Sequence, residues 1–191
     1  DDLVDWTSEI RALALEATEG FRLAPSVYSP PSLADAEDGT RGTLSLPSAT
    51  GGANWEGAAI DPETGVIYVP SRTALAVMSL GKDEDSDLDL SAAFGVRVPR
   101  VQGLEIVKPP YGRITAIDMN TGEHKWMIAN ADTPDRIKNH RLLEGIEIER
   151  TGIPTRSGVL VTKSLLFVGE GTGGPGASPI FRAVDKATGD I

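Results

Sequence analysis

Asn54 and Trp55 are the neighbouring residues whose types fit ligand binding best in this chain, and glycines flank them at Gly51, Gly52 and Gly57. An amide and an indole N–H side by side suit a ligand rich in carbonyl and carboxylate oxygens. Glycines let a backbone approach such a ligand closely. The alternative is a loop asparagine beside a tryptophan packed in the interior, and the residues alone leave both interpretations open.

An acidic segment raises the question of a calcium site. Asp85, Asp87 and Asp89 have the i, i+2, i+4 spacing that opens an EF-hand loop. Leu90 stands where the loop glycine belongs, however, and Val96 stands where the bidentate glutamate belongs. We therefore interpret the segment as a solvated loop, and the sequence identifies no metal ligand.

A glycine-rich segment matches a dinucleotide-binding pattern only in part. Gly169, Gly171 and Gly174 satisfy G-x-G-x-x-G after a strand, but Pro175 and Pro179 follow where a helix would have to begin. Without a helix N-terminus there is no site for a pyrophosphate. We interpret the segment as a bend between strands.

Hydrolytic and histidine-based chemistry find no support in the sequence. Ser157 does not lie in a G-x-S-x-G elbow, which a serine nucleophile of the α/β-hydrolase type would need. His124 and His140 are the two histidines, and their spacing is not that of metal ligands. The Asn-Trp loop remains the strongest candidate site.

An internal repeat determines the expected architecture. The frame Ala-(Ile/Val)-Asp-x-x-Thr-Gly occurs three times, with its aspartates at Asp61, Asp118 and Asp185, which lie 57 and 67 residues apart. Each copy predicts a tight hairpin turn, because the aspartate can accept backbone N–H bonds and the glycine supplies a positive φ. Periods of this size in a strand-rich chain predict propeller blades. The expected fold class is all-β, a partial β-propeller of several four-stranded antiparallel blades with a short N-terminal helix.

The remaining elements follow from local patterns. A helix is expected within residues 5–20, with Thr7 as its N-cap and Gly20 as its C-cap. Trp126 lies eight residues after Asp118 and is expected to pack between blades. The connection 130–155 is expected to hold one or two helical turns around 134–143. Strands are expected at 43–46, 74–80, 112–118, 125–129 and 180–184, and a strand-turn-strand is expected at 158–168.

Composition limits the classes of partner. The 191 residues suffice for one sizeable domain, and a formal net charge of −10 disfavours nucleic acid and anionic membranes as partners. The absence of cysteine excludes disulfides and thiolate metal sites. No stretch approaches the roughly 18 apolar residues of a membrane span.

Three segments together resemble a known family: TGGANWEGAAIDPETGVIYVPS, PPYGRITAIDMNTGEHKW and RSGVLVTKSLLFVGEG. They are similar to the C-terminal portion of the pyrroloquinoline quinone (PQQ)-dependent dehydrogenases, in particular the quinoprotein glucose dehydrogenase-like branch. The A-x-D-x-x-T-G-x-x-x-W frame resembles that family's tryptophan-docking motif, which occurs once per blade of an eight-bladed propeller. The resemblance runs from about Leu13 to Ile191.

The resemblance implies a cofactor and a role for the Asn-Trp loop. In the family, the quinone lies at the propeller centre beside a calcium or magnesium ion, and an aspartate base helps to move a hydride from an alcohol or aldose carbon to it. Asn54 and Trp55 are then cofactor-binding residues, the amide and the indole N–H each bonding to a quinone oxygen. The segment Arg156 to Gly158 loosely matches a position near the rim of the cofactor.

The resemblance also implies what lies elsewhere. The catalytic aspartate, the metal ligands and the tryptophan that stacks on the quinone are expected upstream of Asp1. Residues 1–191 are then a C-terminal fragment of a PQQ-dependent dehydrogenase propeller domain, expected to be inactive and to self-associate when isolated. The third copy of the repeat stops at Ile191, two residues short of its docking tryptophan.

The expected function is a part in oxidising a small-molecule alcohol or a glucose-like aldose sugar, with a quinone or a cytochrome as electron acceptor. The expected location is the periplasm, with attachment to the inner membrane through segments that precede this chain. The alternative is a noncatalytic β-propeller scaffold for protein assembly. The Asn-Trp loop discriminates between the two, because a scaffold has no need of it.

Overall fold

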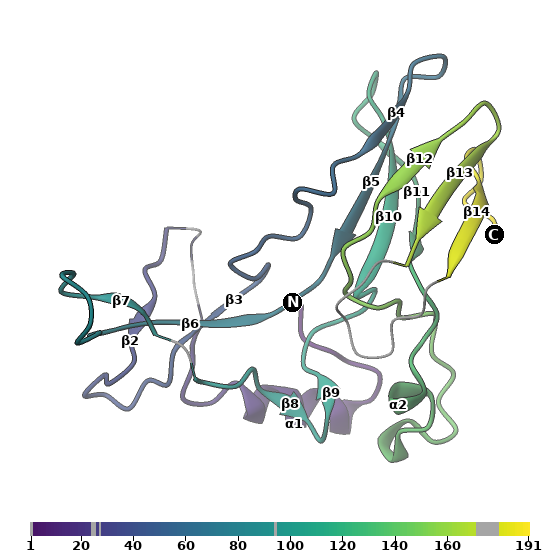
Figure 1. Ribbon diagram of the computed structural model, residues 1–191. Helices are drawn as coiled ribbons and strands as arrows, with labels where there is room; N and C mark the ends of the chain where they lie inside the picture. The colour runs from purple at the N-terminus through teal and green to yellow at the C-terminus, as the bar shows by residue number, and fades with distance from the viewer. Residues whose placement is uncertain (1, 24–25, 27, 94, 171–179) are drawn as a thin grey trace. The chain divides into compact units, whose positions relative to one another are not determined.

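The computed structural model describes residues 2–191 except 24–25, 27, 94 and 171–179 (Figure 1). The chain forms two compact units. The first unit consists of Asp1–Gly51 and Ala74–Lys108, and the second of Gly52–Thr73 and Pro109–Ile191. The candidate site lies in the second unit.

The helix of the first unit, α1, spans Ser8–Ala17. Its N-cap is Thr7, as predicted: the Thr7 hydroxyl accepts a hydrogen bond from the Ile10 N–H at 3.1 Å. Ile10 is fully buried and anchors the apolar face of the helix. The predicted C-cap at Gly20 is wrong, because the helix already ends with Thr18 as C-cap.

The strands of the first unit form a mixed sheet in the order β1-β3-β6-β2, with β7 paired to β6. β1 pairs with β3 and β2 with β6 in parallel, which departs from the expected antiparallel blades. The two-residue strands β1 and β2 lie in the proline-rich stretch 21–33, where no periodic pattern indicates a pairing partner. A separate hairpin joins β8 to β9. The bounds are β1 Arg22–Leu23, β2 Ser32–Leu33, β3 Thr43–Ser45, β6 Ala76–Gly81, β7 Ser91–Ala93, β8 Arg100–Val101 and β9 Leu104–Glu105.

The second unit consists of two antiparallel sheets, one with the strand order β11-β10-β5-β4 and the other with the order β12-β13-β14 (Figure 1). With α1, they confirm the fold class, a partial all-β propeller with a short N-terminal helix. The helical turns predicted around 134–143 are present as α2 (Asp135–Lys138) and η1 (Arg141–Leu143). The strand bounds are β4 Ala59–Asp61, β5 Val66–Arg72, β10 Gly112–Asp118, β11 His124–Ala129, β12 Val159–Val161, β13 Leu165–Gly169 and β14 Phe181–Asp185.

The aspartates of the repeat mark hairpin turns, as predicted. An Asp61 carboxylate oxygen accepts a hydrogen bond from the Glu63 N–H at 3.2 Å, and Gly65 closes the turn with φ +70°. Asp118 and Asp185 each accept from the backbone N–H two residues further on, at 2.8 Å in both turns. The hydrogen bond from the backbone of the second turn lowers the pKa of Asp118.

The copies of the repeat do not correspond to one blade each, as the sequence predicted. Asp118 lies opposite Val66 in the pairing of β10 with β5, so Asp61 and Asp118 belong to the same sheet. Asp185 belongs to the other sheet. A four-stranded meander has two hairpin turns at one end, and the motif serves both of them. The interval of 57 residues therefore lies within one blade, whereas the interval of 67 residues leads from one blade to the next.

Trp126 packs between the two sheets, as predicted. Its ring centroid lies 5.7 Å from that of the buried Tyr68. The indole N–H of Trp126 and the hydroxyl of Tyr68 both donate to the carbonyl oxygen of Lys186, at 3.2 Å and 3.1 Å. A Cβ at Gly189 would lie 3.1 Å from the indole ring, so a glycine fits this position. The buried residues of this interface are Val66, Tyr68, Ile114, Ala116, Leu166, Val168 and Val184.

A buried ion pair joins the two sheets at the same end as Trp126. The Lys186 ammonium lies 2.6 Å from the Asp61 carboxylate, with side chains 12% and 5% exposed. The hydrogen bond from Lys186 is the main reason that the pKa of Asp61 falls below its ordinary value, and the hydroxyl of Thr64 adds to it. The three turn aspartates thus act in folding, and this one also joins neighbouring blades.

Candidate functional site

The loop that carries Asn54 and Trp55 precedes β4, the first strand of its sheet. The Gly57 N–H donates to the Asn54 carbonyl at 3.0 Å, and Gly57 has φ +71°, so residues 54–57 form a tight turn. The positive φ of this turn is the reason for a glycine at position 57. Crowding is not the reason, because a Cβ there would meet no atom within 4 Å. At the start of the loop, the Gly52 carbonyl accepts from the Arg72 N–H at 3.0 Å, which ties the loop to the end of β5.

The turn presents its side chains to the outside. The Trp55 side chain is 89% exposed, and Asn54 is exposed as well. The interpretation of Trp55 as a packed interior tryptophan is therefore wrong for this chain. An exposed indole next to an exposed amide leaves the binding interpretation of the loop in place.

A second segment, residues 155–158, precedes β12, the first strand of the neighbouring sheet. The structure brings the two segments together: the Arg156 Nε lies 3.3 Å from a Glu56 carboxylate oxygen. Glu56 directly follows Trp55, although Arg156 is 100 residues further along the chain than Glu56. The site therefore lies where the first strands of two adjacent sheets begin.

Buried hydrogen bonds hold the segment that carries Arg156. The Ser157 hydroxyl accepts from the Asn130 side-chain amide at 2.7 Å and donates to the Glu170 carbonyl at 3.2 Å. The Thr155 hydroxyl donates to the same carbonyl. Because Thr155 and Ser157 are buried on either side of it, Arg156 projects from a fixed backbone. Ser157, whose sequence context gave no support for a nucleophile, thus stabilises the local backbone.

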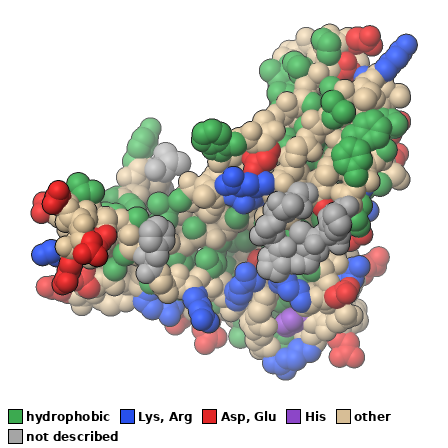
Figure 2. All heavy atoms as spheres, viewed as in Figure 1, with side chains coloured by type: hydrophobic (Ala, Val, Ile, Leu, Met, Phe, Trp, Pro, Cys, Tyr) green, Lys and Arg blue, Asp and Glu red, His purple; other side chains and the backbone are tan. Residues whose placement is uncertain are grey.

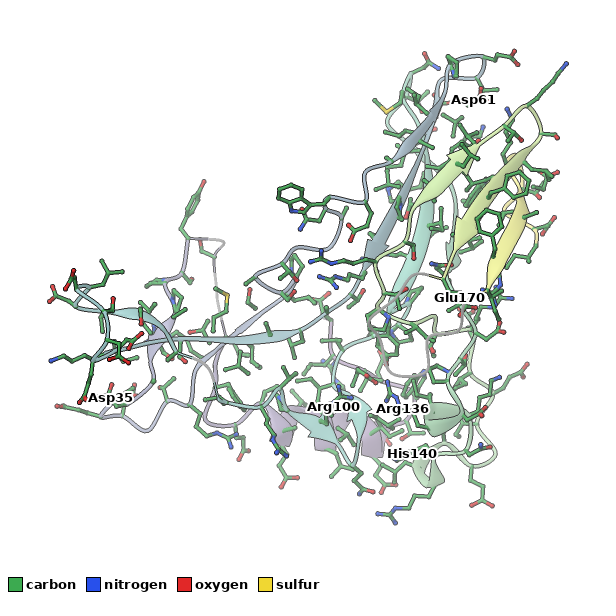
Figure 3. All side chains as sticks on the ribbon, viewed as in Figure 1. Asp35, Asp61, Arg100, Arg136, His140 and Glu170 are labelled. Atoms are coloured by element: carbon green, nitrogen blue, oxygen red, sulfur yellow. The ribbon has the colours of Figure 1, made fainter. Side chains whose placement is uncertain are left out.

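Ion pairs continue this network towards the surface. The buried Glu170 carboxylate pairs with Arg182, and Arg182 also contacts Asp132 at 3.3 Å. Asp132 in turn pairs with Arg150 at 3.5 Å. In Figure 3, Glu170 and Asp61 mark opposite ends of the two sheets. The Asn54 loop and Arg156 thus belong to the end away from the Asp61–Lys186 pair.

The ion pair between Glu56 and Arg156 lines a hollow of only about 10 Å³. Gly52, Arg72 and Ser157 also line it. A cavity of that volume has room for about one water molecule. The charged groups that line it are two guanidinium groups, Arg72 and Arg156, and the Glu56 carboxylate.

The acidic triple and the two histidines are not among the residues that line this hollow. Asp85, Asp87 and Asp89 are exposed in a loop of the first unit, where Figure 2 shows acidic side chains gathered around β7. His140 caps η1, its Nδ1 accepting from the Leu142 N–H at 3.2 Å. In the described part of the chain, no group of three or more acidic or histidine side chains is arranged to hold a metal ion.

The glycine-rich bend, Gly169, Gly171 and Gly174, falls largely on residues 171–179, which lie outside the described residues. The described helices include none that is long and apolar enough to cross a membrane.

Comparison with known families assigns the chain. All of residues 1–191 match the family described as PQQ, the glucose/ethanol/alcohol dehydrogenase beta-propeller domain. This chain belongs to that family. The tryptophan packing between the sheets is thus the docking of one PQQ-family blade on the next, and the resemblance to the PQQ-dependent dehydrogenase family is confirmed.

Three relatives of the PQQ-family chain are each 28% identical to it. Lupanine 17-hydroxylase (cytochrome c) from Pseudomonas sp. aligns with 78% of this chain and 16% of its own length. The probable quinate dehydrogenase (quinone) of Xanthomonas campestris pv. juglandis aligns with 79% and 21%. Quinate/shikimate dehydrogenase (quinone) of Acinetobacter baylyi aligns with 47% and 14%. The chain spans about a fifth or less of the length of these quinoprotein dehydrogenases.

The sequence did not indicate that Glu56 is the partner of Arg156. The sequence pointed to Asn54, Trp55 and loosely to residues 156–158, and the structure joins the two segments through Glu56. Arg72 also lines the site and was not singled out. Its position at the end of β5, opposite Gly112 in the register, could have indicated it only once the strand pairing was known.

Proposed function

We propose that this chain forms part of the cofactor-binding face of a quinoprotein dehydrogenase that oxidises a hydroxyl-bearing small molecule. The substrate class is an alcohol or an aldose sugar, and PQQ, when bound, supplies the electrophile that accepts a hydride. Asn54 and Trp55 bind and orient the quinone. The names of the relatives include dehydrogenases of quinate, a hydroxy acid, which makes a ring alcohol a suitable first substrate.

The observation that carries this proposal is the exposed Asn-Trp turn at the start of β4. An indole that is 89% exposed contributes little to folding, so its N–H and its ring remain available to a ligand that approaches the turn. The turn is held by its own backbone hydrogen bond and by the end of β5, so both side chains are presented from a fixed backbone. A scaffold would gain nothing from this arrangement.

The groups present at the site fit the quinone. PQQ carries carbonyl and carboxylate oxygens, all of which accept hydrogen bonds. The Asn54 amide, the Trp55 indole N–H and the two guanidinium groups are all donors. Guanidinium groups suit an anionic cofactor, although the chain as a whole is acidic.

Other parts of the reaction are assigned to residues outside this chain. The proposal includes a catalytic aspartate and a calcium or magnesium ion held elsewhere in the complete protein. The electron acceptor is a quinone or a cytochrome, the two classes printed in the names of the relatives. A periplasmic location is part of the proposal, and fractionation of cells that express the protein tests it.

The experiment that tests the role of the loop compares Asn54→Ala with Asn120→Ala in the complete protein. Asn120 is also an exposed turn asparagine, but it lies in the turn that follows β10. We expect Asn54→Ala to weaken quinone binding by about 1 to 3 kcal/mol, because a cofactor oxygen loses its donor. The control should bind the quinone as the wild type does. Titration of the apoprotein with PQQ, followed by tryptophan fluorescence, measures both affinities.

The melting temperature of the apoprotein completes this test. Asn54→Ala should leave it nearly unchanged, because a loop amide supports little packing. If the variant melts at a clearly lower temperature and binds the quinone normally, the loop is structural and the proposal fails. A parallel assay with ethanol, glucose and quinate in the presence of PQQ and calcium tests the substrate class. Oxidation of none of the three would contradict it.

A further inference from the structure

The ion pair of Glu56 and Arg156 differs from the pair of Lys186 and Asp61, which also links the two sheets. It joins the segments that precede β4 and β12, directly beside the exposed Trp55. The contact is a single one, from the guanidinium Nε at 3.3 Å, and the Arg156 side chain is 47% exposed. Guanidinium groups hold carboxylates best through two parallel hydrogen bonds, and this pair does not use that geometry.

The buried pair of the two sheets, Lys186 with Asp61, is arranged for stability. Lys186 and Asp61 lie 2.6 Å apart and are almost fully buried, and further hydrogen bonds satisfy the carboxylate. By contrast, the Arg156 side chain is 47% exposed and that of Glu56 19%, and an ion pair with one partner in solvent contributes less to stability than a fully buried and hydrogen-bonded one. Within the described part of the chain, Arg156 makes this one ion pair. Another carboxylate could therefore replace Glu56 at low cost.

The small hollow lined by Glu56 and Arg156 also supports an exchange of carboxylates. The hollow beneath it holds about one water molecule, so a ligand cannot enter while Glu56 remains on Arg156. If Glu56 turns away, another carboxylate can bind Arg156 through two parallel hydrogen bonds, because Glu56 contacts only the Nε of that guanidinium. Arg72 lines the same hollow and adds a second positive charge. The backbone under Arg156 stays fixed by the buried Thr155 and Ser157 hydroxyls.

We propose that Arg156 is the carboxylate anchor of the site and that Glu56 occupies it when no ligand is bound. Ligand binding exchanges one carboxylate for another on the same guanidinium. This inference rests on the proposed function. The ligand carboxylate has two sources, the quinone itself or a substrate that is a hydroxy acid, and the experiment below separates them.

The experiment uses the complete protein with the variants Arg156→Gln, Arg156→Lys and Glu56→Gln. The matched control is Arg150→Gln, because Arg150 is 40% exposed and also contacts its carboxylate through Nε, at 3.5 Å. The first arm titrates each apoprotein with PQQ. The second arm measures KM, with the quinone saturating, for quinate and for its uncharged methyl ester. Calorimetry with quinate alone supplies a binding measurement that needs no quinone.

If the quinone supplies the carboxylate, Arg156→Gln should weaken PQQ binding about 10- to 100-fold, the value of a charge-assisted hydrogen bond pair. If the substrate supplies it, PQQ binding is unchanged, and KM rises by a similar factor for quinate but not for the ester. In either case Glu56→Gln should bind the carboxylate ligand as tightly as the wild type or a few-fold more tightly, because the competitor is gone. Arg156→Lys should fall between, and Arg150→Gln should match the wild type.

The inference is overturned if Arg156→Gln and Arg156→Lys bind both carboxylates as the wild type does. It is also overturned if Glu56→Gln weakens binding as much as Arg156→Gln, since the pair would then act as one structural unit. A protein that oxidises substrates normally with either result keeps the proposed function and loses only the anchor. A protein that binds no quinone, yet binds quinate through Arg156, loses the proposed function and keeps the anchor. Binding of neither compound ends both proposals.

Discussion

The two ends of the paired sheets use similar residues for different purposes (Figure 3). At the end marked by Asp61, the Lys186 ammonium pairs with the buried Asp61 carboxylate, and the Trp126 indole and the Tyr68 hydroxyl donate to the Lys186 carbonyl. At the other end, Trp55 has an exposed indole, and Arg156 contacts Glu56 through one long ion-pair contact. Both ends contain a tryptophan and an ion pair that joins sheets.

The difference lies in burial and in the number of partners. A tryptophan that is packed and hydrogen-bonded between sheets, and a charge that is buried and paired, commit their interaction energy to the fold. The same groups, when exposed and under-used, keep their hydrogen-bonding capacity for a ligand. We therefore expect substitutions at the Asp61 end to lower stability, and substitutions at the Trp55 end to change binding alone.

The largest effect is expected for Trp126→Ala. This change removes the ring that packs on Tyr68 and leaves the Lys186 carbonyl with one donor fewer. We expect a loss of about 3 kcal/mol in the free energy of unfolding, at the low end for tryptophan because the side chain is only partly buried. Urea unfolding followed by circular dichroism measures it. A loss close to that of Trp55→Ala would contradict the comparison.

Breaking the buried ion pair should change the acid stability of the protein. The pKa of Asp61 lies below its ordinary value of 3.8, so the wild-type pair stabilises the fold above that pH and loses its effect as the pH falls further. In Lys186→Met the carboxylate is left buried without its cation, so its pKa rises and the loss begins at a higher pH. Melting temperatures from about pH 3 to pH 7 should show the shift.

Lys163→Met provides the control for this pH experiment, because Lys163 is exposed. Its melting temperature should follow the wild-type pH profile. If Lys186→Met also followed that profile, the pair would contribute nothing to stability, and the contrast between the two ends would be lost.

A smaller effect is expected for Gly189→Ala, with Gly122→Ala as its matched control. The two glycines hold the same position in the repeat and have φ +84° and +78°. Both changes should cost about 1 kcal/mol for the left-handed backbone. Gly189→Ala should cost more, because its Cβ would press on the Trp126 ring, whereas the Cβ at Gly122 would meet nothing. Equal losses in thermal unfolding would mean that the indole moves aside freely.

The smallest effect on stability is expected for Trp55→Ala. The side chain is 89% exposed, so the free energy of unfolding of the apoprotein should change by less than about 0.5 kcal/mol. Quinone titration should show weaker binding, because the indole N–H is lost. A destabilised apoprotein with unchanged quinone affinity would place Trp55 with the structural tryptophans and remove the distinction between the two ends.

The local turns could be predicted from the sequence. Asp61 and Gly65 specify a hairpin turn through bonds within five residues, and the structure has that turn. The packing of Trp126 between sheets followed from its offset in the repeat. Thr7 was identified as an N-cap for the same reason, since the cap bond reaches only to Ile10. These features depend on neighbours along the chain, so their residues are enough to indicate them.

The sequence by itself thus determined the hairpins, the family and the Asn54–Trp55 loop, because each is written in a short run of residues. Only the tertiary structure decided that Asp61 and Asp118 share one sheet, since identical turns fit both hairpins of a blade. It also brought Lys186 to Asp61 and Arg156 to Glu56. Those pairings depend on which sheet faces which, and on how far each side chain is buried. Burial makes one pair part of the fold and leaves the other open to a ligand.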